Sequence, residues 1–185
     1  MTAWQSPWPQ VARTLDGSSL VAPIPTFDGG RIDVLGWVAV NGIDTWQVVD
    51  LGTIPNAQMA TVMRETDVAV FPNRCEGGTN QVAVECMACG LPVILSQNTG
   101  HLNLIENDNC YPLQSQTPLE GMVAGFRAVP GWGESRVDEL EEMLERVFVD
   151  RMAARERGRR AAERLSEMTW ARTARKMKQV VLASC

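Results

Sequence analysis

Residues 67–96 read DVAVFPNRCEGGTNQVAVECMACGLPVILS, and this stretch decides the fold. It opens with the apolar run 67–71, continues through a polar loop with two glycines, and ends with a second apolar run at 91–96. Between the loop and the second run, residues 81–89 have the apolar pattern of a helix, which Gly90 stops. A strand, a helix and a second strand in such close succession predict a parallel sheet covered by helices.

The sequence on either side extends this alternation. Upstream, we expect helices and strands over the ranges 7–15 (helix), 20–24 (strand), 33–41 (helix), 46–51 (strand) and a helix from Asn56. The pattern of 33–41 also fits a strand, and we favour a helix. Downstream, we expect helical turns at 99–106, a strand at 110–113, an irregular linker at 114–133, and helices at 134–149, 150–167 and after Thr169.

These elements predict an α/β fold, with a Rossmann-like parallel sheet, helices on both of its faces and a C-terminal helical segment. We expect residues 1–133 to form the Rossmann-like domain. Residues 134–185 would supply helices that pack on the same domain.

Composition excludes several classes of protein. The 185 residues, 45% of them apolar and 21% charged, suit one globular domain with at most a small appendage. No apolar run approaches the roughly 20 residues of a membrane span, and the N-terminus lacks the pattern of a signal peptide. A cytoplasmic protein without a membrane span is therefore expected. Basic residues form no patch, and the chain carries a net charge of −5, which argues against a nucleic-acid partner.

Cysteine and histidine are too few and too scattered for a metal centre. The chain has five cysteines and one histidine, His101. Cys86 and Cys89 form a CxxC pair, but the pair lies inside a predicted helix without further ligands. We expect reduced, mostly buried thiols and no metal site.

The loop between the first strand and the helix is where a ligand is expected. In parallel sheets, ligands bind beyond the carboxyl ends of strands, next to helix N-termini whose free N–H groups attract anions. Gly77 and Gly78 let a ligand approach the backbone and allow conformations closed to other residues. Glu76 and Glu85 bracket the loop with carboxylates that suit hydroxyl groups of a sugar or ribose. Both could instead be surface acids, or Glu85 could cap a neighbouring element.

Residues 71–105 resemble the donor-site segment of the GT-B retaining glycosyltransferases of family 4. The matching features are Phe71-Pro72, Glu76-Gly77, Glu85, the run from Met87 to Val93 and Thr99-Gly100. The strongest similarity covers about residues 48–113, and weaker similarity continues to about residue 182. The family places seven residues between its two glutamates, whereas eight separate Glu76 from Glu85 here.

This resemblance implies a nucleotide-sugar substrate, with neither a cofactor nor a metal. Glu76 would be the catalytic residue, which holds the hydroxyls of the donor sugar near the reacting carbon. Glu85 would bind the ribose, and the base would lie near Gly52 and Thr53. The full set of donor-binding residues implied by the resemblance is Gly77, Gly78, Thr79, Asn80, Glu85, Gly52 and Thr53.

The resemblance also implies that something is missing. GT-B enzymes have two such domains, with the acceptor between them, and a basic Arg/Lys pair precedes the donor loop. Residues 1–133 contain no lysine. We therefore expect an N-terminally truncated chain, the donor-binding half of a hexosyltransferase, inactive without its acceptor domain or a partner chain. A non-catalytic nucleotide-sugar binding module and a flavodoxin-like regulatory domain are the alternatives.

Overall fold

A computed structural model of the protein describes residues 34–49, 54–106, 108–123 and 126–183. The chain divides into two compact units, Met1–Pro55 and Asn56–Cys185. The expected helix at 7–15, the expected strand at 20–24, Gly52 and Thr53 lie outside the described residues.

The first unit contains helix α2 (Val34–Val40) and the short 3-10 helix η1 (Thr45–Gln47). Helix α2 confirms the helical interpretation of 33–41. The strand expected at 46–51 is wrong over its described part. The chain there folds back on itself, with the Val48 N–H donating to the Thr45 carbonyl at 3.2 Å. Trp46 is exposed, so the apolar residues of this segment do not form one buried face.

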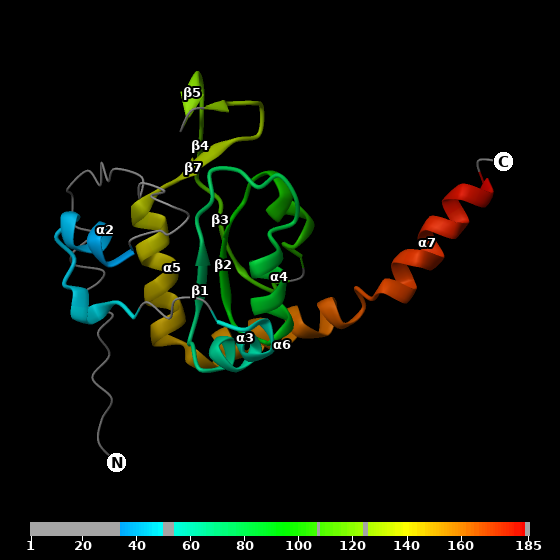
Figure 1. Cartoon of the computed structure of the whole chain (residues 1–185), viewed down its shortest axis with the longest axis horizontal. Helices are drawn as coiled ribbons and strands as arrows, with labels where there is room; N and C mark the ends of the chain where they lie inside the picture. Colours follow the sequence, from blue (N-terminus) through cyan, green and yellow to red (C-terminus); the bar gives the residue numbers. More distant parts are fainter. Residues whose placement is uncertain (1–33, 50–53, 107, 124–125, 184–185) are drawn as a thin grey trace, which may run out of the picture. The chain divides into compact units, whose positions relative to one another are not determined.

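The second unit is built on a parallel sheet in the order β1, β2, β3 (Figure 1), whose strands are Ala69–Phe71, Val93–Ser96 and Tyr111–Leu113. Strand β2 is central and completely buried. Phe71 pairs with Leu95, and Ser96 pairs with Leu113, so all three strands end at the same edge of the sheet. The parallel sheet predicted from the sequence is confirmed.

Helices cover both faces of this sheet, as expected. The helices that pack around the sheet are α3 (Asn56–Arg64), α4 (Gln81–Ala88), α5 (Val137–Val149) and α6 (Arg151–Ser166). Because side chains alternate along a strand, Val93 and Leu95 point to one face and Ile94 to the other. The first two share a core cluster with α3, α4 and α6, and Ile94 shares a second cluster with α5 and Ala154.

Helix α6 approaches the end of α4 closely through Gly158. A Cβ at this position would overlap with the Gly90 carbonyl oxygen and lie 3.1 Å from the nitrogen of Pro92. Gly90 has a φ of 76°, which fits its expected role as the stop of α4.

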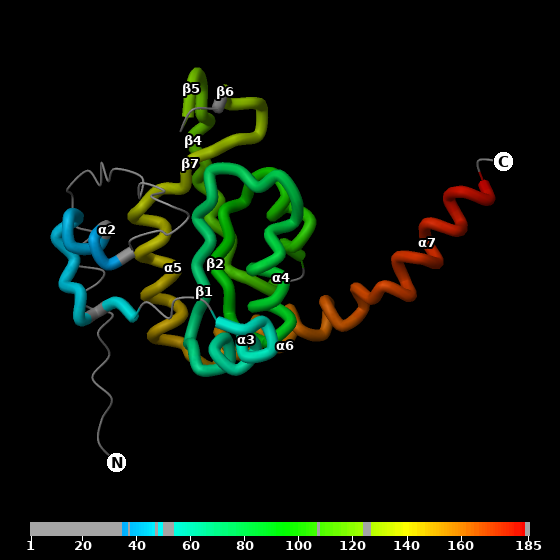
Figure 2. The backbone as a smooth tube through the Cα atoms, viewed as in Figure 1, coloured from blue at the N-terminus to red at the C-terminus, as the bar shows by residue number. Residues whose placement is uncertain are grey.

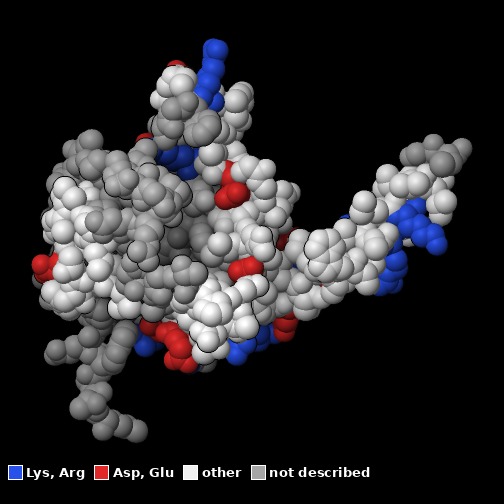
Figure 3. Space-filling view, viewed as in Figure 1, with Lys and Arg blue, Asp and Glu red and all other residues white. Residues whose placement is uncertain are grey.

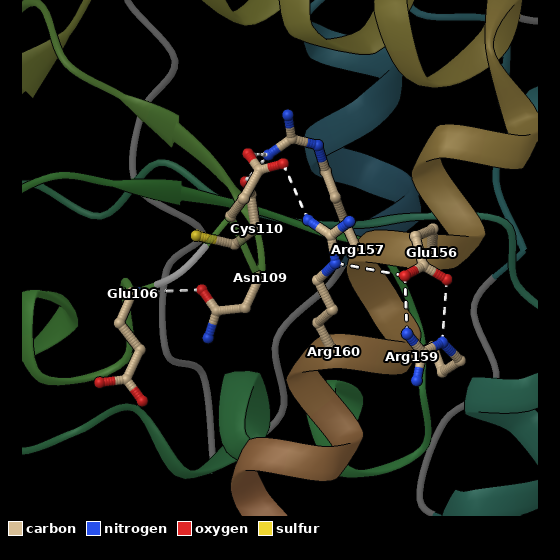
Figure 4. A network of polar contacts seen from close by, with 8 residues as sticks. Glu106, Asn109, Cys110, Glu156, Arg157, Arg159 and Arg160 are labelled. Carbon is tan, nitrogen blue, oxygen red and sulfur yellow. Dashed lines mark hydrogen bonds and ion pairs between the residues drawn. The ribbon is translucent and has the colours of Figure 1, made fainter.

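A polar network joins α6 to the loop before β3 (Figure 4). Asp108 accepts hydrogen bonds from Arg157 and Arg160, and Arg157 also donates to the Cys110 carbonyl at 3.0 Å. The Arg157 guanidinium lies 4.6 Å from the ring centre of Tyr111. The Arg157 side chain is only 17% exposed, so its ion pair with Asp108 is screened less than the surface ion pairs along α6.

The irregular linker expected at 114–133 is wrong, because the chain forms two short antiparallel pairs there (Figure 2). These pairs are β4 (Gln116–Pro118) with β7 (Gly133–Ser135), and β5 (Met122–Val123) with β6 (Phe126–Arg127). Strands of two or three residues are too short to show the alternation that identifies a strand in a sequence. Because β7 takes up residues 133–135, α5 begins three residues later than expected.

Helix α7 (Trp170–Ala183) ends the described chain. Thr169 caps it as expected, since its hydroxyl accepts a hydrogen bond from the Arg172 N–H at 3.2 Å. No residue of α7 is buried. Its charged side chains are all basic (Figure 3), namely Arg172, Arg175, Lys176 and Lys178. Across the described residues, no helix is long and apolar enough to span a membrane.

Candidate functional site

The loop that joins β1 to α4 lies at the carboxyl edge of the sheet, where a ligand site was expected. Ser96 at the end of β2 and Asn98 just after it fix the base of this loop. Ser96 donates through its hydroxyl to the Asn73 carbonyl at 2.7 Å, and Asn98 donates through Nδ2 to the same oxygen at 2.8 Å. Ser96 and Asn98 are both buried, so they satisfy a carbonyl that water would otherwise have to solvate.

The β4–β7 pair supports the same loop from another side. The Gly133 N–H donates to the Arg74 carbonyl at 2.9 Å, and the Arg74 side chain forms an ion pair with Glu134. Asn98 also contacts the β4–β7 strand pair, because its Nδ2 donates to Gln116 Oε1 at 2.9 Å. The segment expected to be a linker is therefore part of the support of the loop.

Glu76 is held through its backbone by the segment that follows β2. Its N–H donates to Thr99 Oγ1 at 2.7 Å, and its carbonyl accepts from the Gly100 N–H at 3.3 Å. The Glu76 side chain is half-buried, and its Oε2 accepts a hydrogen bond from Asn73 Nδ2 at 3.2 Å. No described residue donates to Oε1, so this oxygen can accept from a ligand hydroxyl.

Gly77 and Gly78 are exposed, and a Cβ on either would meet open space. Neither has a positive φ. The expectation that they take conformations closed to other residues is therefore wrong. At this site, Asn80 and Thr99 have left-handed backbone instead, with φ values of 52° and 37°. The absence of side chains at 77 and 78 leaves the backbone of the loop accessible, and that is the property a ligand needs.

Backbone N–H groups gather at the start of α4. Within the described part of the chain, no group accepts a hydrogen bond from the N–H of any residue from 77 to 82. The N–H groups at the start of a helix carry partial positive charge and bind anions such as phosphates. Asn80 caps the helix, since its Oδ1 accepts from the Ala83 N–H at 3.2 Å.

Glu85 lies one turn into α4, on the face of Gln81. It accepts a hydrogen bond from Gln81 Nε2 at 3.2 Å and is half-buried. A carboxylate with a local amide partner and partial access to water needs no other partner to be stable. Glu85 is nevertheless available to a ligand that binds along the start of α4, because the Gln81 amide occupies only Oε1.

Sequence reasoning missed the buried histidine behind this site. His101 lies in the 3-10 helix η2 (Thr99–Asn103), is completely buried, and places Nε2 2.9 Å from Asn80 Nδ2. Burial lowers the pKa of His101, opposed by its hydrogen bond to the Ser96 backbone and by the charge of Glu76. From the sequence, His101 was considered only as a metal ligand. Its position directly after Thr99-Gly100, which match the family's donor-site segment, was the signal that could have placed His101 near the site.

The arrangement suits a ligand that combines an anionic group with hydroxyls. Unpaired N–H groups would face the anion, and carboxylates on the loop and on α4 would accept from hydroxyls. Among the described residues, no three His, Cys, Asp or Glu side chains gather in a way that could hold a metal ion. Thr79 lies exposed between the glycines and Asn80, within the run of unpaired N–H groups.

Comparison with known proteins agrees with this architecture. The family model described as "Family 4 Glycosyltransferase in conflict systems" matches residues 53–177. No curated protein matches the chain in sequence. Among solved structures, sucrose-phosphate synthase from Thermosynechococcus elongatus matches 81% of the chain with a TM-score of 0.61 and 23% identity.

A second similar structure is Anabaena Alr3699/HepE in complex with UDP, with a TM-score of 0.58 and 19% identity over 81% of the chain. HepE in complex with UDP-glucose matches the same share with a TM-score of 0.57. The chain spans about a third of the length of these proteins, 34% of the synthase and 35% of HepE. At these identities the likeness establishes the fold, which is that of one half of a GT-B glycosyltransferase.

Proposed function

Because the chain belongs to the family 4 glycosyltransferases in conflict systems, we propose that it binds the nucleotide-sugar donor of a retaining glycosyltransferase that transfers a hexosyl group. The observation that carries this proposal is the run of N–H groups from residue 77 to residue 82, which have no acceptor among the described residues and are bracketed by Glu76 and Glu85. A nucleotide-sugar has a diphosphate for the N–H groups and two sets of hydroxyls for the carboxylates.

In this proposal each residue has a distinct task. Glu76 accepts hydrogen bonds from the donor sugar through Oε1, with its backbone fixed by Thr99 and Gly100. Gly77, Gly78, Thr79 and Asn80 contact the sugar and the diphosphate, and Glu85 exchanges the Gln81 amide for the ribose hydroxyls. We also assign the base to the neighbourhood of Gly52 and Thr53, by resemblance to the family.

The departing diphosphate is the group that most needs stabilisation in such a transfer. Fixed N–H dipoles at the start of α4 stabilise developing negative charge without reorganising. They carry no full positive charge, and the nearby Arg74 is engaged by Glu134. We therefore propose that an acceptor domain or a partner chain completes the site, and that this chain alone has negligible transfer activity.

Calorimetric titration with UDP-, GDP- and ADP-glucose tests donor binding directly. We expect one of the three to bind, and Glu76→Gln and Glu85→Gln each to weaken binding by roughly tenfold, as loss of a charged hydrogen bond predicts. Glu145→Gln is the matched control, because Glu145 is exposed on α5 outside the site. Failure of all three sugar nucleotides to bind at millimolar concentration would reject the proposal.

A transfer assay separates a half-enzyme from a binding module that has no catalytic role. We expect no transfer by the chain alone, and transfer with retained anomeric configuration once a chain with the complementary GT-B half is added. If donor binding persists but a co-purifying partner never restores transfer, a non-catalytic nucleotide-sugar module is the better description.

A further inference from the structure

The single histidine of the chain is a buried polar group for which the proposed function has no role. His101 has an exposed fraction of 0%, and its ring lies between the end of β2 and the start of α4. A buried polar ring has to satisfy both of its nitrogens. The partners that it uses decide which nitrogen carries the proton.

The partners of His101 fix one tautomer. Nδ1 lies 3.1 Å from the Ser96 carbonyl oxygen, which can only accept, so Nδ1 must carry the hydrogen. The Ser96 hydroxyl, 3.0 Å from Nδ1, donates its own hydrogen to the Asn73 carbonyl and therefore faces Nδ1 with a lone pair. Nε2 is then an acceptor, and the Asn80 amide 2.9 Å away is its donor.

The orientation of Asn80 is fixed independently at its other end. Its Oδ1 accepts the Ala83 N–H at 3.2 Å, which leaves Nδ2 to donate to the histidine. Turning the amide over would put a donor against the Ala83 N–H and an acceptor against Nε2, so both contacts would be lost. A continuous chain of hydrogen bonds therefore runs from Ser96 through His101 and Asn80 to the first turn of α4.

Asn80 needs such support because of its backbone. Its φ of 52° and ψ of 86° lie in the left-handed region, which residues other than glycine adopt uncommonly and asparagine adopts with the help of hydrogen bonds made by its side chain. This conformation turns the chain from the loop into α4. It therefore sets the direction of the unpaired N–H groups on either side of residue 80.

We propose that His101, neutral and protonated on Nδ1, is a positioning residue of the donor site that holds Asn80 in the conformation needed to bind the donor diphosphate. This inference rests on the proposed function. The same short segment holds Glu76, because Thr99 and Gly100 bind its backbone. Segment 99–101 thus positions both the carboxylate and the N–H groups of the site.

Protonation of His101 would break this arrangement. A hydrogen on Nε2 would point at the Asn80 amide hydrogens, and the amide could relieve the clash only by giving up its cap on Ala83. The partners of the ring from β2 and α4, Ser96 and Asn80, are uncharged, and Glu76 from the loop is the charged group that acts on it. Burial lowers the pKa of the ring, which keeps it neutral at pH 7.

The first test is nitrogen-15 NMR of the imidazole in the whole chain, where a single histidine makes the assignment unambiguous. We expect a neutral ring with its hydrogen on Nδ1 at pH 7. A hydrogen on Nε2, or an imidazolium at pH 7, would overturn the proposal. This measurement needs no ligand, so its result is independent of whether the chain binds a nucleotide-sugar.

The second test measures the affinity for UDP-, GDP- or ADP-glucose, whichever binds the wild type, between pH 5 and 8. His101→Gln keeps an acceptor for Asn80 but cannot titrate in this range, whereas His101→Phe keeps the ring shape without any acceptor. We expect wild-type affinity to fall with acid, His101→Gln affinity to change much less, and His101→Phe to bind roughly five- to tenfold more weakly at pH 7.

These outcomes separate the two proposals. If the wild type binds a sugar nucleotide and both variants bind it equally well at every pH, the positioning role is wrong and the proposed function stands. If the wild type binds none of the three, the proposed function is wrong and the donor role of His101 falls with it. A His101→Phe variant that unfolds leaves the decision to the NMR result and to the pH profile of His101→Gln.

Discussion

Gly100 contacts Gly78 backbone to backbone, and this contact joins the loop after β1 to the loop after β2. A Cβ at residue 100 would overlap with the Gly78 carbonyl oxygen and lie 2.7 Å from its carbonyl carbon. The neighbouring Gly100 N–H donates to the Glu76 carbonyl at 3.3 Å. The position of Glu76 therefore depends on the lack of a side chain at residue 100.

Gly100→Ala should displace the loop that carries Glu76. The new methyl group meets backbone, which cannot rotate away, so we expect a loss of about 1–3 kcal/mol in the free energy of unfolding. We also expect at least about a tenfold loss in affinity for the donor. Urea denaturation and calorimetric titration measure the two effects.

Gly77→Ala is the matched control for that substitution. A Cβ at residue 77 meets open space, and the residue has no positive φ, so stability should change by less than about 0.5 kcal/mol. Donor affinity should still fall, because the methyl group occupies the approach to the loop. Equal stability loss in Gly77→Ala and Gly100→Ala would contradict the contact between residues 78 and 100.

The alternation of strands and helices was predictable because each element carries its own local pattern. The apolar run before Phe71, the helical spacing after Asn80 and the stop at Gly90 each follow from neighbouring residues in the chain, and β1, α4 and the turn at Gly90 confirm them. The short pairs in segment 114–133 were missed, because two or three residues per strand do not establish a period.

The supporting residues of the site were not predictable for a different reason. The contacts of Glu76 with Thr99 and Gly100 span more than 20 residues of sequence and depend on how two loops meet in space. Likewise, nothing in the pattern around His101 shows that its ring reaches Asn80. The roles of Glu76 and Glu85 toward a donor remain predictions.

Gly158 offers a test of helix packing in which two effects have opposite signs. Replacing a glycine inside a helix with alanine normally stabilises the helix by about 0.5–1 kcal/mol. Here the new methyl group would overlap with the Gly90 carbonyl oxygen, so we expect Gly158→Ala to destabilise the protein by about 1–3 kcal/mol instead. Thermal or urea unfolding gives the sign directly.

Arg155→Ala is the control for the Gly158 substitution. Arg155 lies on the exposed face of the same helix, so its replacement should leave stability within about 0.5 kcal/mol of the wild type. A stabilised Gly158→Ala variant would show that α6 does not approach Gly90 as closely as the structure indicates.

Thiol labelling should distinguish the buried Cys86 and Cys110 from Cys75 in the loop. Burial raises the pKa of Cys86 to about 11 and that of Cys110 to about 12, so both stay protonated and unreactive at pH 8. Cys75 is half-buried beside Glu76. We expect iodoacetamide to label Cys75 faster than Cys86 and Cys110 in the native protein, and all cysteines in urea. Labelling of Cys110 as fast as Cys75 would contradict the burial of Cys110.

The burial of His101 predicts how stability depends on pH. The pKa of His101 is lowered in the folded protein, so between that lowered pKa and about pH 6.5 the unfolded chain binds a proton that the folded chain does not. Stability is therefore highest above the unfolded pKa and falls as the pH drops below it, by at most about 1.4 kcal/mol per pH unit.

Since carboxylates also titrate in acid, the quantity to measure is the difference in unfolding free energy between wild type and His101→Gln at pH 7.5 and 5.5. We expect the wild type to lose up to about 1.4 kcal/mol relative to the variant over this interval. A difference that does not change with pH would mean that His101 has the same pKa in both states, which its burial against Ser96 and Asn80 does not allow.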